Sequence, residues 1–508
     1  MSMAQLSIAQ TQASPDSALK AILSGLKGTA LPLQQAVQHA LTNATSVRKA
    51  EASYLAAGGS ARKEAGFFDP QLFFNLNYLD QQQPTASFFT PPVLATIQTT
   101  SQTGLRMNLP IGTELQLAVN TVRLSTNSQI ALLNPEYDAF GSLSFRQPLL
   151  GGFTVSARKQ LVKSDRELDA QKARYDQQVL AVSSEVERSY WDLYAAERDY
   201  AVQKLTRDRA AAFLQETEIR AKAGLVGPNQ VASARTFLAE QELLLLERDE
   251  QLDRQSDQLA SLIGVRPDAG MPRFISADEP PREFPDEPVD TLVEHAQKNN
   301  LDLLAAQKDV EAAHALASAA GWEALPSVNL VGSLGGSGLA GTSRQVNIFG
   351  VDTSVTPPGV GLSDVLTQVS KRQFPNWSVG VEVSIPIGFR KGLGEHDRLE
   401  AEVLNAQQRY IEQSRNLEEQ VRTTYRELSH GKRRLDVARE GVEAAEEQVR
   451  IGSIEFHNGR STAFELVRLG ADLATAQQRY SEALVRTAKA AATLKQLTSG
   501  EYPAVTNR

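Results

Sequence analysis

The sequence predicts an α+β membrane protein in which three copies of the chain share a transmembrane β-barrel that is continuous with a long α-helical coiled-coil barrel. Three observations predict this fold. The same order of elements occurs twice along the chain, each copy contains strand-like alternation, and each copy ends in very long helices with a seven-residue apolar period. The chain is therefore expected to consist of two internal repeats.

The composition excludes several classes of protein. The 508 residues carry a net charge of −8, with 60 acidic and 52 basic residues, so the charge balance does not indicate a nucleic-acid-binding protein. No cysteine is present, so disulfides, thiolate metal sites, cysteine catalysis and lipid attachment at an N-terminal cysteine are excluded. The histidines form no metal-ligand pair, and no cofactor, phosphate-loop or nucleophile motif occurs. We expect no enzymatic activity.

Hydropathy leaves only one way to cross a membrane. No run of about 18 apolar residues exists, so a transmembrane helix is not expected. Barrel strands alternate apolar and polar residues and remain possible. The N-terminus has neither a basic region nor an apolar core, which fits a cytoplasmic chain or one whose signal peptide has been removed. The remaining sequence favours a removed signal peptide.

The internal repeat begins with a helix in each copy. Residues 33–70 and 292–326 each read as one amphipathic helix that ends at a proline, and Ala40 and Asn43 of the first copy align with Ala296 and Asn299 of the second. The predicted division is a flexible segment 1–30, a first repeat 31–270, a linker 271–290, a second repeat 291–498 and a tail 499–508.

Strand-like sequence follows each helix, over about 70–148 and 326–387. The period is two residues in both copies, as shown by Phe74, Leu76 and Tyr78 and by Val379, Val381, Val383 and Ile385. A further hairpin is predicted around 110–113, and the segments 84–92, 126–135 and 335–361 read as long loops. The barrel would have about twelve strands if the hairpin is extracellular and more if it joins the wall.

Long helical hairpins complete each copy, over about 153–264 and 391–498. Apolar residues recur every seven positions, as in Leu245, Leu252 and Leu259 of the first copy and Val421, Leu428 and Leu435 of the second. Such a sustained heptad repeat indicates a coiled coil. A proline-free helix over 392–456 would be roughly 100 Å long.

These elements require partners. Two or three strands cannot close a barrel or fold alone, and unpaired strand edges are costly in lipid. Helices with a heptad seam need neighbours as well. Three copies around one axis would meet both needs, giving a short barrel on a long hollow helical cylinder.

At the motif level the chain resembles the TolC family of outer-membrane efflux proteins. The resemblance covers about 31–497 and rests on the strand exit Gln147-Pro148-Leu149-Leu150 and on two helix turns, 223–235 (AGLVGPNQVASAR) and 458–468 (NGRSTAFELVR). It implies a homotrimer in the lipid of the bacterial outer membrane, with the helical barrel extending into the periplasm. It also implies a periplasmic adaptor (membrane fusion) protein and an inner-membrane transporter as partners, in a tripartite efflux or type I secretion system that conducts substrates passively.

The resemblance points to a gate at the periplasmic end. The family narrows its channel with acidic residues six and nine positions after each turn glycine. Here Gly459 places Glu465 and Arg468 at these positions, and Gly224 places Gln230 and Ser233 there. The gate interpretation is a crowded ring of Glu465 carboxylates that favours cations. The alternative is an exposed Glu465–Arg468 pair, three residues apart on a helix, of little energetic weight.

The helix tips are the expected docking surface for the adaptor. Apolar side chains at a turn suggest docking, whereas the alternative is that the glycines end the helices and the apolar groups pack within the chain. The predicted docking residues are Gly224, Leu225, Val226, Gly227, Pro228, Asn458, Gly459, Arg460 and Ser461.

Two other classes of protein fit parts of the sequence. A coiled-coil scaffold with a small β domain would share the heptads but would need no apolar band on its strands. An adaptor would carry one helical hairpin, whereas two alternate with strands here. The sequence does not indicate which cargo is carried or whether the partner pump is driven by protons or by ATP.

Overall fold

The structure is a computed structural model that describes residues 15–86, 90–281, 287–348, 351–458 and 460–499. It divides into two compact units. We call them the helical unit (Met1–Tyr54, Gln171–Ala305 and Tyr410–Arg508) and the sheet unit (Leu55–Ala170 and Ala306–Arg409).

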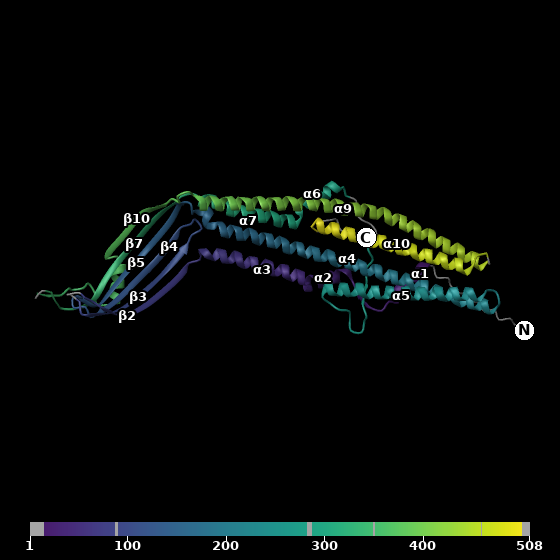
Figure 1. Cartoon of the computed structure of the whole chain (residues 1–508), viewed down its shortest axis with the longest axis horizontal. Coiled ribbons are helices and arrows are strands. Elements are labelled where there is room, and N and C mark those ends of the chain that lie inside the picture. Colours follow the sequence, from purple (N-terminus) through teal and green to yellow (C-terminus); the bar gives the residue numbers. More distant parts are fainter. Residues whose placement is uncertain (1–14, 87–89, 282–286, 349–350, 459, 500–508) are drawn as a thin grey trace. The chain divides into compact units, whose positions relative to one another are not determined.

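Figure 1 labels most of the elements, which are, in chain order, α1 (Pro15–Ser24), β1 (Thr29–Leu31), α2 (Leu33–Asn43), α3 (Thr45–Ala65), the 3₁₀ helix Gly66–Phe68, β2 (Gln71–Pro84), β3 (Val93–Asn108), β4 (Glu114–Thr126), β5 (Leu133–Leu150), α4 (Thr154–Lys222), α5 (Pro228–Ile263), β6 (Phe274–Ser276), α6 (Val289–Asn299), α7 (Leu301–Glu323), β7 (Ser327–Ser343), β8 (Val346–Ile348), β9 (Val351–Thr353), α8 (Leu362–Ser370), β10 (Phe374–Ser384), α9 (Arg390–His457) and α10 (Ala463–Leu497).

The two helices predicted over 33–70 and 292–326 are each broken into a pair, so the prediction of single helices is wrong. Ala44 separates α2 from α3 and Asn300 separates α6 from α7, and both residues have extended backbone. The Oδ1 atom of Asn300 accepts the backbone N–H groups of Asp302 and Leu303, at 3.0 and 3.2 Å. A side chain that caps the first turn of α7 in this way starts a new helix instead of continuing the old one.

Heptad residues hold the helical unit together. Leu252 and Leu259 of α5 and Leu473 of α10 have no exposed surface, and Leu428 of α9 is 2% exposed. Because these positions recur every seven residues, each long helix presents one continuous apolar stripe to its neighbours.

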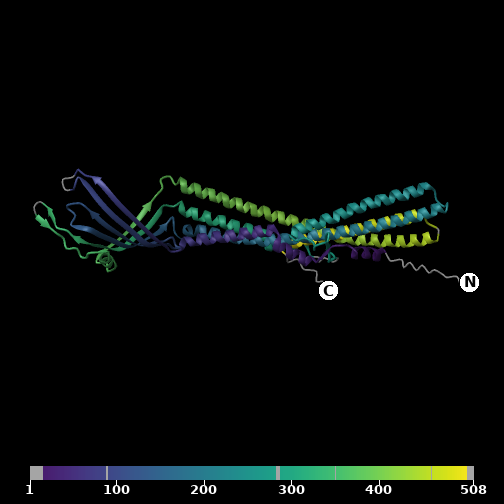
Figure 2. The ribbon, with the colours of Figure 1, turned by 90° about the horizontal axis from the view of Figure 1, so that it is seen from below.

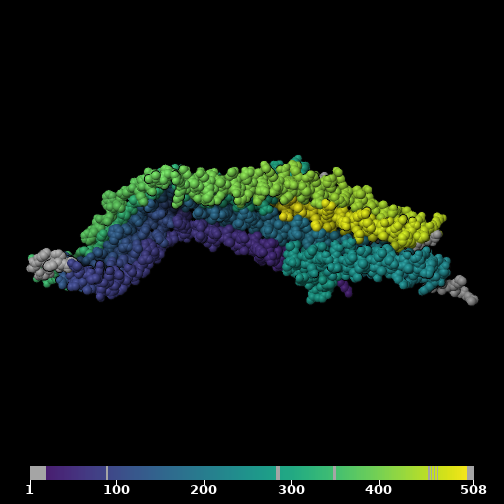
Figure 3. Space-filling model, in the orientation of Figure 1, coloured from purple at the N-terminus to yellow at the C-terminus, as the bar shows by residue number. Residues whose placement is uncertain are grey.

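Helix α10 lies alongside both α9 and α4 (Figures 1 and 3). Its Leu494 packs in one apolar cluster with Val421 of α9. On its other side the ammonium of Lys489 lies 2.7 Å from a carboxylate oxygen of Asp192 on α4. The same helix therefore joins the two long hairpins within the helical unit.

A buried polar centre fixes the segment between the two hairpins. The Tyr190 hydroxyl of α4 accepts the N–H groups of Ala277 and Asp278, at 2.9 and 3.0 Å, and lies 2.9 Å from the carbonyl oxygen of Leu31, to which it can donate. Strands β1 and β6 pair in parallel at this point. The segment predicted as the linker 271–290 thus places Phe274, 2% exposed, in the main apolar cluster.

Glu197 adds a second contact two helical turns further along α4. Its two carboxylate oxygens accept the N–H and the hydroxyl of Ser276, at 2.6 and 2.5 Å. Burial raises the pKa of Glu197 to about 7, although the two hydrogen bonds from Ser276 act in the opposite direction. An ionised carboxylate at this depth therefore destabilises the folded state relative to a protonated one.

The sheet unit contains one six-stranded sheet in the order β10-β7-β5-β4-β3-β2 (Figure 1). All neighbours are antiparallel, so the hairpin predicted around 110–113 forms part of the sheet as β3 and β4. The loop predicted over 335–361 is wrong in its first part, because β7 continues to Ser343. Glycines favoured a loop there, whereas the strand uses them for close packing, as described below.

Alternation divides the sheet into two faces. One face is polar, with hydrogen bonds between Asn75 and Gln102 and between Ser333 and Ser378, and an ion pair of 2.8 Å between Arg146 and Glu382. We call the other face the apolar face. On the two edge strands it carries large exposed side chains, which are Leu72, Phe74, Leu76 and Tyr78 on β2 and Trp377, Val379, Val381 and Val383 on β10.

Among the described residues, no helix is both long enough and apolar enough to span a bilayer.

The stability of the helical unit should depend on pH through Glu197. A folded pKa raised from 4.5 to about 7 means that the folded state holds its proton more strongly, so this contribution is present at low pH and is lost as pH rises through 7. We expect Glu197→Gln to change the apparent unfolding temperature little at pH 5 and to raise it at pH 8. The gain in free energy at pH 8 should be of the order of 3 kcal/mol.

Thermal melts of the detergent-extracted protein test this expectation. Glu240→Gln, at an exposed position on α5, is the matched control and should shift neither melt. Equal shifts at both pH values for Glu197→Gln would show that the carboxylate does not titrate in this range.

Candidate functional site at the helix tips

The first helix turn joins α4 to α5. Gly224 adopts a left-handed conformation with φ of 73°, and the N–H of Leu225 bonds to the carbonyl of Arg220 at 2.9 Å, which closes the end of α4. Gly227 then precedes α5, with Pro228 at its first position. The turn leaves Leu225 74% exposed, whereas Val226 is half-buried.

The second turn joins α9 to α10. The N–H of Arg460 bonds to the carbonyl of Glu455 at 2.8 Å, and the hydroxyl of Thr462 accepts the N–H of Glu465 at 3.2 Å. Thr462 is thus the N-cap of α10. Asn458 and Arg460 are exposed and Ser461 is half-buried, while Gly459 lies outside the described residues.

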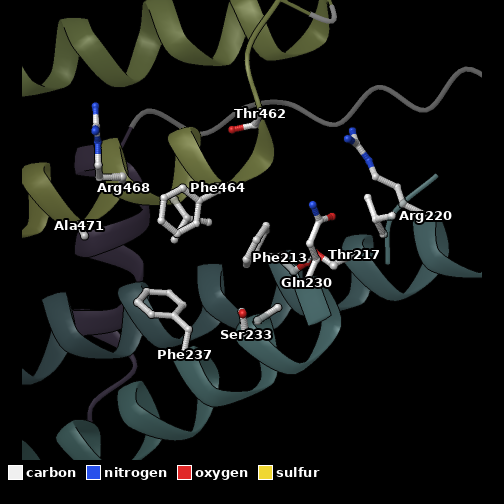
Figure 4. Close-up of a pocket in the computed structure, with 13 residues that line it drawn as sticks. Phe213, Thr217, Arg220, Gln230, Ser233, Phe237, Thr462, Phe464, Arg468 and Ala471 are labelled. Atoms are coloured by element: carbon white, nitrogen blue, oxygen red, sulfur yellow. Dashed lines mark hydrogen bonds between the residues drawn. The ribbon is translucent and has the colours of Figure 1, made fainter. Parts of the chain in front are cut away.

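A pocket of about 670 Å³ lies between the two tips of the helical unit (Figure 4). Three phenylalanine rings dominate its wall: Phe213 from α4, Phe237 from α5 and Phe464 from α10. Figure 4 shows these rings directed into one shared space. Val226 completes the apolar wall from the first turn, so this docking candidate packs partly within the chain.

The pocket brings together three of the four predicted gate residues. Gln230 and Ser233 line it from α5 and Arg468 lines it from α10. Figure 4 shows the guanidinium of Arg468 directed away from the rings, so its aliphatic part forms the wall. The sequence spacing had placed these residues at equivalent positions of two repeats, and the structure places them around one space.

Glu465 is not among the residues that line the pocket. Its carboxylate lies 3.8 Å from Arg468 and 3.4 Å from the Ser461 hydroxyl, and the Glu465 and Arg468 side chains are 52% and 62% exposed. A carboxylate in the first turn of a helix is also favoured by the positive end of the helix dipole. This is the geometry of the exposed pair described above, and the gating role of the four residues stays a prediction.

The charges at the pocket are cationic. Arg220 and Arg468 are its charged residues, and none of the described lining residues is a carboxylate. Each arginine has an acidic neighbour outside the lining, Glu216 at 2.7 Å and Glu465 at 3.8 Å. Within the described part of the chain, no group of three metal-ligating side chains comes together.

The three phenylalanines and Thr462 were not among the predicted site residues. Local signals in the sequence point to Phe213, Phe237 and Thr462. Phe213 and Phe237 lie on either side of the first turn, where two antiparallel helices bring them together. Thr462 and Glu465 have the Thr-x-x-Glu spacing of a helix start.

The family described as outer membrane efflux protein matches residues 36–265 and 292–500 of the chain. The two matched segments contain the long helices, both turns and every strand of the six-stranded sheet. No curated protein sequence gives a significant match.

Solved outer-membrane channels share the fold. VceC from Vibrio cholerae is 16% identical with a TM-score of 0.61, and the match covers 93% of this chain and 97% of that one. CmeC from Campylobacter jejuni is 14% identical with a TM-score of 0.62, covering 92% and 86%. The MtrE channel of Neisseria gonorrhoeae, in its open state, is 15% identical with a TM-score of 0.62, covering 92% and 89%.

The Thr462 cap should stabilise the first turn of α10 at the second helix tip. Thr462→Ala removes the acceptor of the Glu465 N–H and should cost about 1 kcal/mol of local stability. Amide exchange of the first turn of α10, followed by mass spectrometry on peptides that span 462–470, should then accelerate about fivefold. Ser461→Ala, which removes only the 3.4 Å contact, should have a smaller effect. Equal acceleration in both variants would contradict the assignment of Thr462 as the cap.

Proposed function

Because this chain belongs to the outer membrane efflux protein family, we propose that three copies form a passive channel that carries substrates from a periplasmic adaptor and inner-membrane transporter to the outside. Membership of the family makes the chain an outer-membrane efflux channel protein and places it in a channel family, not an enzyme class. The trimer, the closed barrel, the passive mechanism and the two partners belong to the proposal, as does the removal of a signal peptide.

The observation that carries the proposal is the two-faced sheet. Its apolar face exposes 79% of Leu72 on β2 and 68% of Val379 on β10, and its other face is polar. Within the described residues, β2 and β10 each pair on one side only. An apolar face suits lipid and a polar face suits a water-filled lumen, but open edges in lipid cost several kcal/mol for each unsatisfied group.

Closure through identical copies removes both edges. The β10 edge of one copy would pair with the β2 edge of the next, so that six strands in each of three copies make a closed wall of eighteen. Barrels of about 16–18 strands enclose an aqueous channel, whereas about 8 strands enclose only packed side chains. A scaffold protein with a small β domain would not need this apolar face.

The helices support an assembly of two repeats per chain. The pair α2 and α3 has 11 and 21 residues, and the pair α6 and α7 has 11 and 23. The hairpin α4–α5 has 69 and 36 residues, and α9–α10 has 68 and 35. These nearly equal lengths would allow six hairpins from three copies to form one cylinder.

Mass and conductance test the proposal together. Light scattering of the detergent-extracted protein should give three times 55.3 kDa for the protein part. The same preparation should form long-lived conducting steps in a planar bilayer without nucleotide or a membrane pump. A monomer that gives no conductance would overturn the proposal.

Ion selectivity tests the gate residues. Arg468→Glu replaces a cation by an anion next to Glu465, so the net charge at the helix tips changes by two units in every copy. The reversal potential in a tenfold KCl gradient should shift toward cation preference, because a ring of carboxylates attracts cations. Arg439→Glu, at an exposed position on α9, is the control and should leave the potential unchanged. An unchanged potential for Arg468→Glu would place this residue away from the conduction path.

Adaptor docking is tested at Leu225. Leu225→Glu puts a charge on the apolar tip, and because a buried unpaired charge is costly, we expect at least a tenfold loss of affinity for the purified cognate adaptor. Val437→Glu on α9 is the matched control, since Val437 is 67% and Leu225 74% exposed. Surface plasmon resonance with the intact trimer measures both, and equal losses would rule out a specific docking role for the tip.

A further inference from the structure

Helix α8 lies on the apolar face of the sheet and not in a free loop (Figure 2, the short green helix beside the strands). Val365 is completely buried and Gln368 is 3% exposed. The amide of Gln368 bonds to both backbone groups of Leu339 on β7, accepting its N–H at 3.0 Å and donating to its carbonyl at 3.2 Å. These contacts fix both the position and the rotation of α8.

The strands beneath α8 have glycine and alanine in the rows where β2 has large apolar side chains. Cross-strand pairing aligns Ala139 and Gly338 with Leu76 of β2, and Gly141 and Gly336 with Phe74. A Cβ atom on Gly141 would lie 2.5 Å from a methyl of Val369, and one on Gly338 would lie 2.7 Å from the carbonyl oxygen of Val365. The glycines and alanines therefore form a recess on the apolar face that α8 fills.

The outward side of α8 restores the apolar surface that the recess removes. Leu362 and Leu366 are four residues apart, so they lie on one stripe of the helix, and they are 43% and 40% exposed. Ser363, Thr367 and Ser370 are exposed on the other side. Helix α8 thus has a packed side, an exposed apolar stripe and an exposed polar side.

We propose that α8 is a membrane-contact element whose Leu362–Leu366 stripe lies against the boundary between acyl chains and headgroups of the lipid bilayer. The inference rests on the proposed function, because it requires the apolar face to be in lipid. A helix with apolar and polar exposed sides is suited to this boundary, where one side meets hydrocarbon and the other meets headgroups and water.

Two observations favour lipid over a second copy of the chain as the occupant. Helix α8 contacts β5 and β7, and its Gln368 bonds to the backbone of Leu339 beyond Ser337, where β10 has ended. Pairing between copies uses the β2 and β10 edges instead. The exposed apolar face also resumes next to the helix, since Trp377 and its partner Leu334 lie one position along the face from Gly336, which is beside Val369 of α8, and are 72% and 47% exposed.

Spin labelling tests the proposal without prior removal of native thiols, because the chain has no cysteine. Nitroxide labels are placed singly at Leu362→Cys and Leu366→Cys on the stripe and at Thr367→Cys on the polar side. Val381→Cys marks the apolar face of the sheet, and Val437→Cys marks an exposed position on α9, with exposed fractions of 62% and 67% in the parent. The trimer is reconstituted into phosphatidylethanolamine–phosphatidylglycerol vesicles.

Power saturation compares the accessibility of each label to oxygen, which concentrates in lipid, and to a water-soluble nickel chelate. The oxygen-to-nickel ratio at 362 and 366 should match that at 381 and exceed those at 367 and 437 several-fold. Two independent positions on the stripe guard against local disturbance by one label.

The outcomes separate this inference from the proposed function. A lipid-like ratio at 381 with water-like ratios at 362 and 366 overturns the role of α8 and leaves the channel intact. Low accessibility to both reagents at 362 and 366, with spin–spin broadening, would place a second copy on the stripe and also overturns it. A water-like ratio at 381 itself contradicts the membrane-embedded sheet, and with it the proposed function.

Discussion

The six-stranded sheet, with one apolar face, one polar face and two open edges, constrains how copies of this protein can assemble. In lipid, the strand edges β2 and β10 must be paired, since backbone groups there have no water to bond to. The alternation of side chains, the number of strands and the identity of the two edges then determine how copies can meet. In the proposed trimer, the nearly equal lengths of α4 and α9 would allow the helices to follow the same symmetry as the strands.

The helical unit combines a firmly fixed centre with a loosely packed end. At the centre, Tyr190 and Glu197 bond to backbone groups of the segment between the hairpins, and apolar side chains such as Leu252 and Leu259 surround them. At the tips, the described residues leave a space of about 670 Å³ between three phenylalanines. Local motion costs least where few buried contacts are broken, so rearrangement of an efflux channel is expected at the tips rather than at the centre.

Local patterns predicted most of the fold. The heptads of α5 and α9 and the alternation of β10 follow directly from side-chain periods of seven and two, which need no knowledge of the partners. The break between α6 and α7 was missed because a single side chain, Asn300, decides whether backbone N–H groups continue α6 or start α7. The break at Ala44 involves no such side chain. Strand β7 was partly missed because its glycines were interpreted as loop formers, although α8 requires them from a distant position in the sequence.

For the candidate site, the resemblance to the TolC family pointed to Glu465, Arg468, Gln230 and Ser233 as gate residues, and the structure places the last three around one pocket, while their gating role stays a prediction. By itself the sequence determined the kinds of element, their order, both turns and the absence of cysteine chemistry, because these depend on neighbouring residues and composition. Only the tertiary structure decided that Glu465 lies outside the pocket, that β3 and β4 belong to the sheet and that α8 covers its apolar face. Those facts depend on contacts between segments far apart in the chain, for which no local period exists.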